Sequence, residues 1–259
     1  MLDRVPDLSR ARVLISNDDG VSAPGIKALE RVMKRIAGEV WVVAPELEQS
    51  ATSHSLTLRH PLRVHKISKH KYSVTGTPTD SVMLAVHEVM KDCPPDLVLS
   101  GINRGGNLGE DVTYSGTVAA AMEGTLLNIP SIAFSLVTPD GAKSHWKTAE
   151  VCVEKVLRGL TGVSFPRGVF LNVNIPDCPV DQITGVETTK QGRRKIGCEL
   201  LKGTDPKGKP YFWIGAQRDE DRSLKNTDLE AVNRNAVSIT PLSMDLTHRG
   251  LMKTLKAVF

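Results

Sequence analysis

Short apolar runs alternate with longer amphipathic segments through the first 177 residues of this chain. The short runs have the length of strands, whereas residues 26–36 repeat apolar side chains at the i, i+3, i+4 spacing of a helix. The pattern predicts strands over residues 13–16, 39–44, 62–66, 72–75, 97–100, 132–135 and 169–174. It predicts helices over residues 26–36, 78–90, 115–127 and 145–160. Thr77 is the expected N-cap of the second helix, with Pro78 at its first position.

The regular alternation of strands and helices favours an α/β fold with a mostly parallel sheet. Most of the strands carry apolar residues on both faces, which is typical of a sheet covered by helices on both sides. Residues 62–66 and 72–75 are expected to form edge strands or a hairpin arm. Ligands of such folds bind at the carboxyl ends of the strands, so the segments that follow the strands are the first candidates for a functional site.

The character of the sequence changes after Asp177, where strands no longer alternate neatly with long helices. We expect a smaller α+β region there that serves oligomerisation. Its predicted elements are a hairpin tip at 203–210, strands at 211–214 and 237–240, and helices at 227–234 and 249–258.

Composition is that of a soluble globular protein, with 40% hydrophobic and 24% charged residues. The formal net charge is +4, and we interpret the Lys and Arg residues as scattered, which argues against a stable nucleic-acid complex. The first 11 residues lack an apolar signal region, and no stretch approaches the roughly 20 apolar residues of a membrane span. We therefore expect a cytoplasmic protein without a membrane partner.

The cysteines are widely separated and form no CxxC or Cys/His metal spacing. They are Cys93, Cys152, Cys178 and Cys198. Free thiols in a reducing compartment are the preferred interpretation, ahead of disulfides.

Two adjacent carboxylates, Asp18 and Asp19, follow the first predicted strand. Like charges side by side repel each other unless a cation or a shared proton offsets them, so this pair is the first candidate for a divalent metal site. The alternative is an ordinary strand-to-helix turn, because Asn17, Asp18, Asp19 and Gly20 are all turn-forming residues.

The segment 44–55 follows the second strand and is rich in hydroxyl and carboxyl groups. A hydroxyl such as that of Ser50 completes an octahedral Mg or Mn site when carboxylates supply the charge. The alternative is a solvated surface loop. His54 alone is weak evidence, because single histidines are more often structural.

The segment 100–109 contains four glycines in ten residues, so its backbone can approach a ligand closely. It has neither the GxGxxG of a dinucleotide site nor the GK[ST] of a P-loop. A dinucleotide oxidoreductase is therefore disfavoured. Asn103 offers an amide oxygen to a metal, and Asn107 an amide donor to an anion.

Ser115, Gly116 and Thr117 open a helix rich in alanine. The simplest interpretation is helix capping by Ser115. Backbone N–H groups and two hydroxyls at a helix start also form a ready phosphate site. Taken together, the four segments serve the chemistry of Mg or Mn beside a phosphoryl group.

The same segments resemble, nearly verbatim and in order, the stationary-phase survival protein SurE family of metal-dependent nucleotidases. The matching strings are SNDDGVSAPG, VVAPELEQSATSHSLTL, GTPTDSV, PDLVLSGINRGGNLGEDVTYSGTVAAAMEGTLL, IPSIAFS, LNVNIP and AVSITPL. Gly106 departs from a common proline, Ser81 from cysteine and Asn128 from glycine, and none of these changes removes a ligand.

The resemblance implies a site made of two groups of residues. The metal ligands, for one divalent cation per subunit, would be Asp18, Asp19, Ser50 and Asn103. The phosphate-binding residues would be Asn107, Ser115, Gly116 and Thr117. It also implies a Rossmann-like catalytic domain over 12–177 after an N-terminal extension, 1–11. The C-terminal extension, 178–259, would be exchanged between subunits of a homodimer or homotetramer.

The implied reaction is hydrolysis of nucleoside 5′- or 3′-monophosphates, with short polyphosphate as a further substrate. We expect a metal-activated water to attack phosphorus, with Asp18 holding the metal and Asp19 orienting the water or passing protons. The competing route is direct attack by a carboxylate, which would form a phospho-aspartate. A different function is also open, that of a metal-dependent nucleotide-binding regulator without turnover.

Overall fold

A nine-stranded sheet forms the centre of the protein in the computed structural model, which describes residues 2–139, 141–196, 199–215 and 218–259. From one edge to the other its strands are β10 (Gly185–Thr188), β15 (Ala236–Ser243), β9 (Val169–Pro176), β7 (Ser131–Val137), β6 (Leu97–Arg104), β2 (Arg12–Ser16), β3 (Glu39–Pro45), β5 (Lys71–Val74) and β4 (Val64–Ser68).

The middle of this sheet is parallel. All neighbours from β9 through β5 run in the same direction, whereas the pairs β15–β9 and β4–β5 are antiparallel. Ile15 on β2 lies opposite Val42 on β3 and Leu99 on β6, so the carboxyl ends of the three parallel strands lie at the same edge of the sheet. The predicted α/β fold with a mostly parallel sheet is confirmed.

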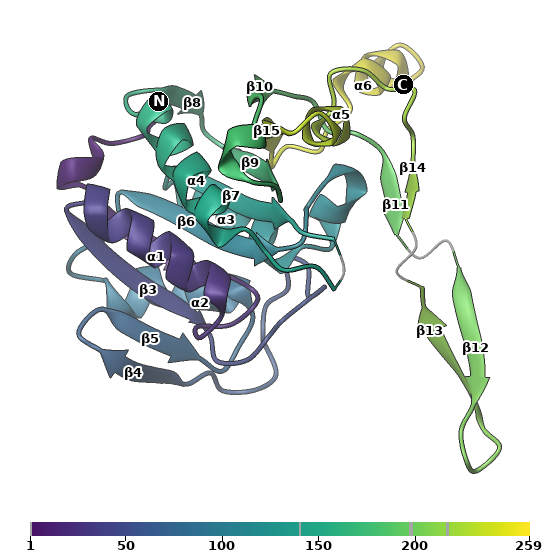
Figure 1. The fold of residues 1–259 in the computed structure, drawn as a ribbon, viewed down its shortest axis with the longest axis horizontal. Coiled ribbons are helices and arrows are strands. Elements are labelled where there is room, and N and C mark those ends of the chain that lie inside the picture. Colours follow the sequence, from purple (N-terminus) through teal and green to yellow (C-terminus); the bar gives the residue numbers. More distant parts are fainter. Residues whose placement is uncertain (1, 140, 197–198, 216–217) are drawn as a thin grey trace.

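Helices cover both faces of the sheet, as expected (Figure 1). On one face α1 (Pro24–Ile36) packs beside α4 (Trp146–Leu160), and on the other α2 (Pro78–Leu84) packs beside α3 (Gly116–Leu126). The stripe of Ile26, Leu29 and Val32 on α1 is fully buried against the sheet. Burial of each such side chain contributes roughly 1.5–3 kcal/mol, which fixes α1 above β2.

The helix predicted over 78–90 begins where the sequence indicated. Thr77 accepts a hydrogen bond from the backbone N–H of Asp80, and the Asp80 side chain accepts one from the N–H of Thr77. These reciprocal bonds satisfy two amide groups at the helix start. The last part, Ala85–Val89, continues as a π-helix rather than an α-helix.

The first residues pack against the body of the protein. Strand β1 (Leu2–Arg4) pairs antiparallel with β8 (Ser164–Pro166), and a 3-10 turn spans Leu8–Arg10. The side chains of Val5, Leu8 and Ala11 are buried in the same core as α1. The predicted boundary between an extension and a catalytic domain at residue 12 stays a prediction.

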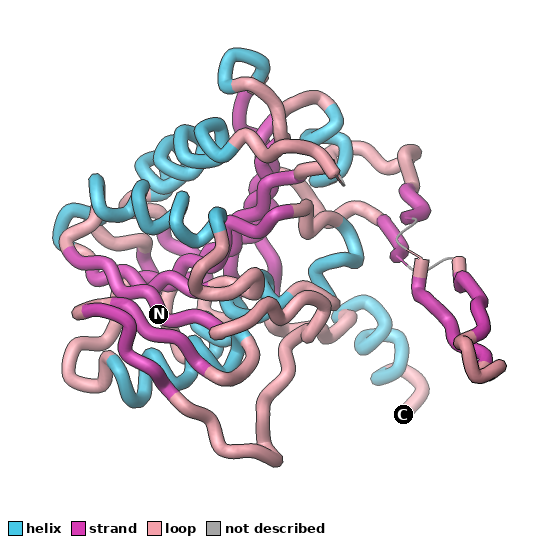
Figure 2. The backbone as a smooth tube through the Cα atoms, turned by 60° about the horizontal axis from the view of Figure 1, so that its bottom comes forward, coloured by secondary structure: helices cyan, strands magenta, loops and turns pink. Residues whose placement is uncertain are grey.

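The residues after 177 divide into two parts. Strands β15 and β10, with α5 (Asp228–Asn233), belong to the central body. The described residues within 194–220, here called the arm, project from it as two antiparallel pairs (Figures 1 and 2). The pairs are β11 (Arg194–Ile196) with β14 (Arg218–Glu220), and β12 (Leu200–Thr204) with β13 (Pro210–Ile214). The chain ends in α6 (Arg249–Lys256).

Three of the cysteines, Cys93, Cys152 and Cys178, are free thiols, and Cys198 lies outside the described residues. No helix in the described part of the chain is long and apolar enough to cross a membrane.

Candidate functional site

A cavity of about 710 Å³ opens at the carboxyl ends of the parallel strands. Its walls include all four predicted metal ligands, Asp18, Asp19, Ser50 and Asn103. The backbone N–H of Arg104 donates to Asp19 Oδ2 at 3.3 Å, so the loops after β2 and β6 are in direct contact. These loops, which are distant in the sequence, therefore meet at one cavity, while the metal-binding role of the four residues stays a prediction.

Asp18 lies at the bottom of the site, with 5% of its surface exposed. The hydroxyl of Thr117 donates to Asp18 Oδ1, and Gly116 lies directly against the aspartate. A Cβ on Gly116 would come within 2.8 Å of Asp18 Cβ. Burial raises the pKa of Asp18, and hydrogen bonds from Thr117 lower it in part. The start of α3 thus holds this carboxylate in place.

Asp19 is less buried than Asp18, but its pKa is strongly shifted. Burial and, next, the negative charge of Asp18 raise the pKa of Asp19 to about 7. The guanidinium of the neighbouring Arg104 donates to the carbonyl of Ala142 at 3.0 Å. Asp19 therefore exchanges a proton in the neutral pH range and is a good candidate for handling protons during a reaction.

The loop after β3 brings Ser50 to the cavity. The backbone N–H of Gln49 donates to the Asp18 carbonyl at 2.7 Å, and that of Ser53 to the Tyr114 carbonyl at 3.0 Å. Ser50 Oγ donates to Glu48 Oε1 at 2.7 Å, which leaves the hydroxyl lone pairs for a ligand. The segment 49–53 is consequently hydrogen-bonded both to the loop after β2 and to the residue that precedes Ser115.

Asn103 is placed at the end of β6, where the glycine-rich loop begins. Its Nδ2 donates to the carbonyl of Gly105 at 2.9 Å, so its Oδ1 is the amide atom suited to a cation. Gly105 has a φ of 119°, a conformation that favours glycine, and this bend turns the chain back along the cavity.

The predicted phosphate residues have different surroundings. Asn107 and Ser115 line the cavity; Asn107 Nδ2 donates to Ser135 Oγ at 2.8 Å, and Ser115 Oγ accepts from the Val118 N–H at 3.0 Å. Gly116 and Thr117 lie behind them against Asp18. Their roles in phosphate binding stay predictions.

Comparison with known proteins assigns this architecture to a family. The family model described as "Survival protein SurE" matches residues 13–197. The chain belongs to the SurE family. It is 58% identical over 255 residues to the "5'-nucleotidase SurE" of Paramagnetospirillum magneticum, covering 98% of each chain. The corresponding protein of Rhodospirillum rubrum is 50% identical over 262 residues, with both chains fully covered.

A solved structure agrees with this assignment. The SurE protein from Aquifex aeolicus superposes with a TM-score of 0.81 at 44% identity, covering 95% of this chain and 99% of that one. The fold expected from the SurE resemblance is confirmed.

The donor set of this SurE-family chain suits a hard divalent cation. Asn17 Oδ1, beside Asp18, is buried without a hydrogen-bond partner among the described residues. In the same part of the chain, no three His, Cys, Asp or Glu residues form a metal-binding group, which differs from typical zinc sites. Carboxylate, hydroxyl and amide oxygens are the ligands that Mg and Mn prefer.

Two features of the SurE-family site were not predicted. Glu48 lines the cavity as a carboxylate additional to Asp18 and Asp19, although only its segment was recognised as polar. Arg194 lines it from the arm and pairs with Asp111, a residue 83 positions away in the sequence. No local pattern indicates such a pairing.

Proposed function

We propose that the protein is a metal-dependent phosphomonoesterase that hydrolyses nucleoside 5′-monophosphates to nucleoside and phosphate. The observation that carries this proposal is one cavity lined by the buried Asp18, the half-buried Asp19 and Ser115, the N-cap residue of α3. A volume of about 710 Å³ is large enough for a whole nucleotide, and similar proteins bear the name 5'-nucleotidase. Nucleoside 3′-monophosphates and short polyphosphate are further proposed substrates.

One divalent cation per subunit, Mg or Mn, would be held by the oxygens of Asp18, Asp19, Ser50 and Asn103. When bound, it supplies an activated water and offsets charge on the phosphoryl oxygens. Asp18 is kept in position by Thr117, and Asp19 is the residue whose pKa of about 7 suits proton transfer near neutral pH. Asn107 and the N-terminal turn of α3 would hold the phosphoryl group, and the presence of Asn107 and the N-cap residue Ser115 in the cavity wall supports this role.

The assembly is proposed to be a homodimer or homotetramer. Large apolar side chains of the arm are exposed, among them Leu200, Trp213 and Ile214, at 62%, 67% and 73%. Exposed apolar surface of this extent is typical of an interface, and exchange of the arm between subunits would bury it. Free thiols at Cys93, Cys152 and Cys178 support a reducing compartment, the cytoplasm.

The function is tested by phosphate release from nucleoside monophosphates with Mg, with Mn and with EDTA. We expect metal-dependent release and a loss of several orders of magnitude in turnover for Asp18→Asn, because the amide carries no charge. Tight nucleotide binding without release under any metal condition would support the regulator instead. Acid-stable labelling of Asp18 or Asp19 with phosphate would replace the water route by the phospho-aspartate route.

A further inference from the structure

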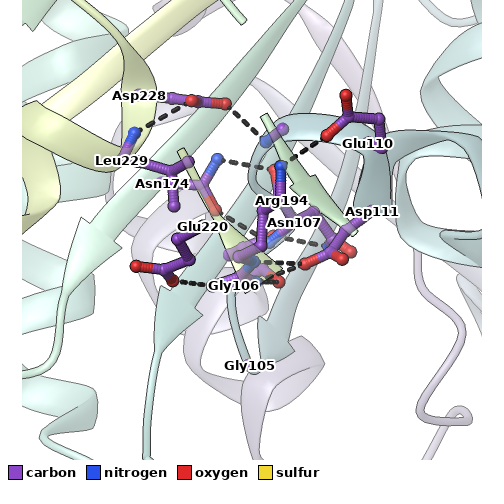
Figure 3. Close-up of polar contacts among 12 residues, drawn as sticks. Gly105, Gly106, Asn107, Glu110, Asp111, Asn174, Arg194, Glu220, Asp228 and Leu229 are labelled. Carbon is purple, nitrogen blue, oxygen red and sulfur yellow. Dashed lines mark hydrogen bonds and ion pairs between the residues drawn. The ribbon is translucent and has the colours of Figure 1, made fainter. Parts of the chain in front are cut away.

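One wall of the cavity is formed by Arg194, which comes from the base of the arm rather than from the parallel strands. Its side chain is 9% exposed, and its partner Asp111 is also 9% exposed. Burial of a guanidinium is costly unless its hydrogen bonds and charge are matched, so its partners indicate what it does (Figure 3).

The guanidinium joins three parts of the chain. Arg194 Nε donates to Asp111 Oδ2 at 3.0 Å, and a terminal nitrogen donates to the same oxygen. That nitrogen also donates to the carbonyl of Gly106 at 3.2 Å, while the other lies 3.6 Å from Glu220 Oε1 on β14. Gly106 and Asp111 thus become fixed to both strands at the base of the arm.

The residues held by Arg194 flank the predicted phosphate ligands directly. Gly106 precedes Asn107, and the backbone carbonyl of Asp111 accepts a hydrogen bond at 3.1 Å from the N–H of Ser115. A shift of Gly106 or Asp111 would therefore move Asn107 and Ser115 within the cavity.

Further hydrogen bonds join residues 191–194 to the loop 105–111. Asp228 accepts hydrogen bonds from the N–H groups of Gly109 at 2.9 Å and Gly192 at 2.8 Å. Gln191 Nε2 donates to the Gly109 carbonyl at 2.9 Å. Residues 191–194 and the loop 105–111 therefore form one hydrogen-bonded unit, in which Arg194 and its partner Asp111 both line the cavity.

We propose that Arg194 is a positioning residue that holds Asn107 and Ser115 in the geometry that binds the phosphoryl group. This inference rests on the proposed function and names the residue through which the arm reaches the site. Arg194 acts through the loop, because Gly106 and Asp111 accept its hydrogen bonds, and the carboxylates of Asp111 and Glu220 offset its charge.

The test compares Arg194→Lys, Arg194→Met and Asp111→Asn with Arg193→Met, which removes an exposed cation one residue away. We expect the KM for a nucleoside monophosphate and the Kd for inorganic phosphate to rise about tenfold or more in Arg194→Lys, because small misplacements of binding groups are costly. We expect kcat at saturating substrate and the Kd for Mn to stay within about threefold, since the side chain of Arg194 contacts Gly106, Asp111 and Glu220 rather than the proposed metal ligands.

Calorimetry measures phosphate and Mn binding directly, so it does not depend on turnover. Arg194→Met is expected to bind phosphate more weakly than Arg194→Lys, and Arg193→Met to match the unsubstituted protein. If Arg194→Met fails to fold, the lysine and asparagine variants carry the comparison. A folded Arg194→Lys that has lost only thermal stability, with KM and phosphate Kd unchanged, would overturn the proposal.

The two proposals fail differently. An unsubstituted protein that releases no phosphate with any metal refutes the phosphatase, while its phosphate Kd still tests Arg194. An active protein whose KM and phosphate Kd are insensitive to Arg194 refutes the positioning role alone.

Discussion

Asp19 has a carboxyl group whose protonation would oppose the proposed binding of a cation. Its pKa of about 7 lies well above the usual range, because the side chain is buried and because Asp18 is negatively charged. Between about pH 4 and 7 the folded, metal-free protein thus retains a proton that the unfolded chain releases. The stability of the metal-free protein therefore falls as the pH rises through this window, and a cation restores it.

We expect Mg or Mn binding to strengthen by up to about tenfold per pH unit below pH 7 and to level off above it, because a ligand must lose its proton. Calorimetry at pH 6 in two buffers with different ionisation enthalpies should show proton release, and the same measurement at pH 8 should show little. Asp19→Asn is the control, with weaker binding and less proton release, because Asp18, whose pKa is also raised, is then the remaining carboxylate of the pair. Equal proton release by this variant would exclude Asp19 as the source.

Thr117 offers a second test at this scale. The resemblance assigns it to phosphate, whereas its hydroxyl donates to Asp18. If that bond is its main role, Thr117→Val should weaken cation binding by about 10–100-fold, the typical cost of losing a partner of a metal ligand. Inorganic phosphate binding measured at saturating Mn should then change little. A variant with normal Mn affinity and weak phosphate affinity would instead place Thr117 in the phosphate site.

At the scale of helices and strands, elements with a clear apolar pattern were predictable. Short elements, and those that depend on pairing with distant residues, were not. Strand β2 was recognised because Val13, Leu14 and Ile15 are apolar on both faces, and all three are fully buried. Strand β6 was expected to end at Ser100 but continues to Arg104, since Asn103 and Arg104 pair with β7 beyond an irregularity. The irregularity includes Gly101, whose φ of 120° favours glycine, but this glycine was interpreted as part of a ligand-binding loop.

The residues of the candidate site also differ in whether local sequence indicates them. Asp18, Asp19, Ser50 and Asn103 were found because oxygen-rich segments follow strands, and parallel strands place such segments together. Strand β1 and Arg194 escaped notice, because their partners lie about 160 and 83 residues away. Such pairings depend on the finished fold rather than on local sequence.

Gly116 allows α3 to approach the loop after β2. A Cβ there would lie 2.8 Å from Asp18 Cβ and 3.0 Å from Pro78 Cγ. We expect Gly116→Ala to lower the free energy of unfolding by about 1–3 kcal/mol, the usual cost of overpacking, and to reduce turnover by displacing Asp18.

The matched control for this substitution is Gly159→Ala in α4, where an added Cβ meets nothing within 4 Å. Alanine at that position should stabilise the protein by about 0.5–1 kcal/mol through helix propensity. Urea unfolding of both variants provides the comparison. A Gly116→Ala protein as stable and active as the control would show that α3 and Asp18 tolerate a wider separation.

At the scale of the whole molecule, the arm is a part of the single chain whose large apolar side chains are exposed. Trp213 lies directly opposite Leu201, and Ile214 opposite Leu200. Opposed residues share a face and successive residues alternate, so both faces of the β12–β13 hairpin carry exposed apolar side chains. A partner that buries both faces must wrap around the hairpin, as an exchanged arm does.

We therefore expect Trp213→Asp combined with Ile214→Asp to shift the protein from an oligomer to a monomer in light scattering, because charges on both faces oppose burial. Lys207→Asp, in the turn between β12 and β13, changes charge on the same hairpin and should leave the assembly intact. Circular dichroism should show both variants folded, since the central sheet does not use these residues.

If the monomer forms, its kinetics link the arm to the site. Arg194 and Glu220 lie at the arm's base, so loss of the partner should raise the KM and phosphate Kd in the same direction as Arg194→Lys, while the Mn Kd stays unchanged. A monomer with unaltered KM would mean that the base of the arm keeps its position without the partner. An oligomer that survives both aspartates would show that other surfaces hold the subunits together.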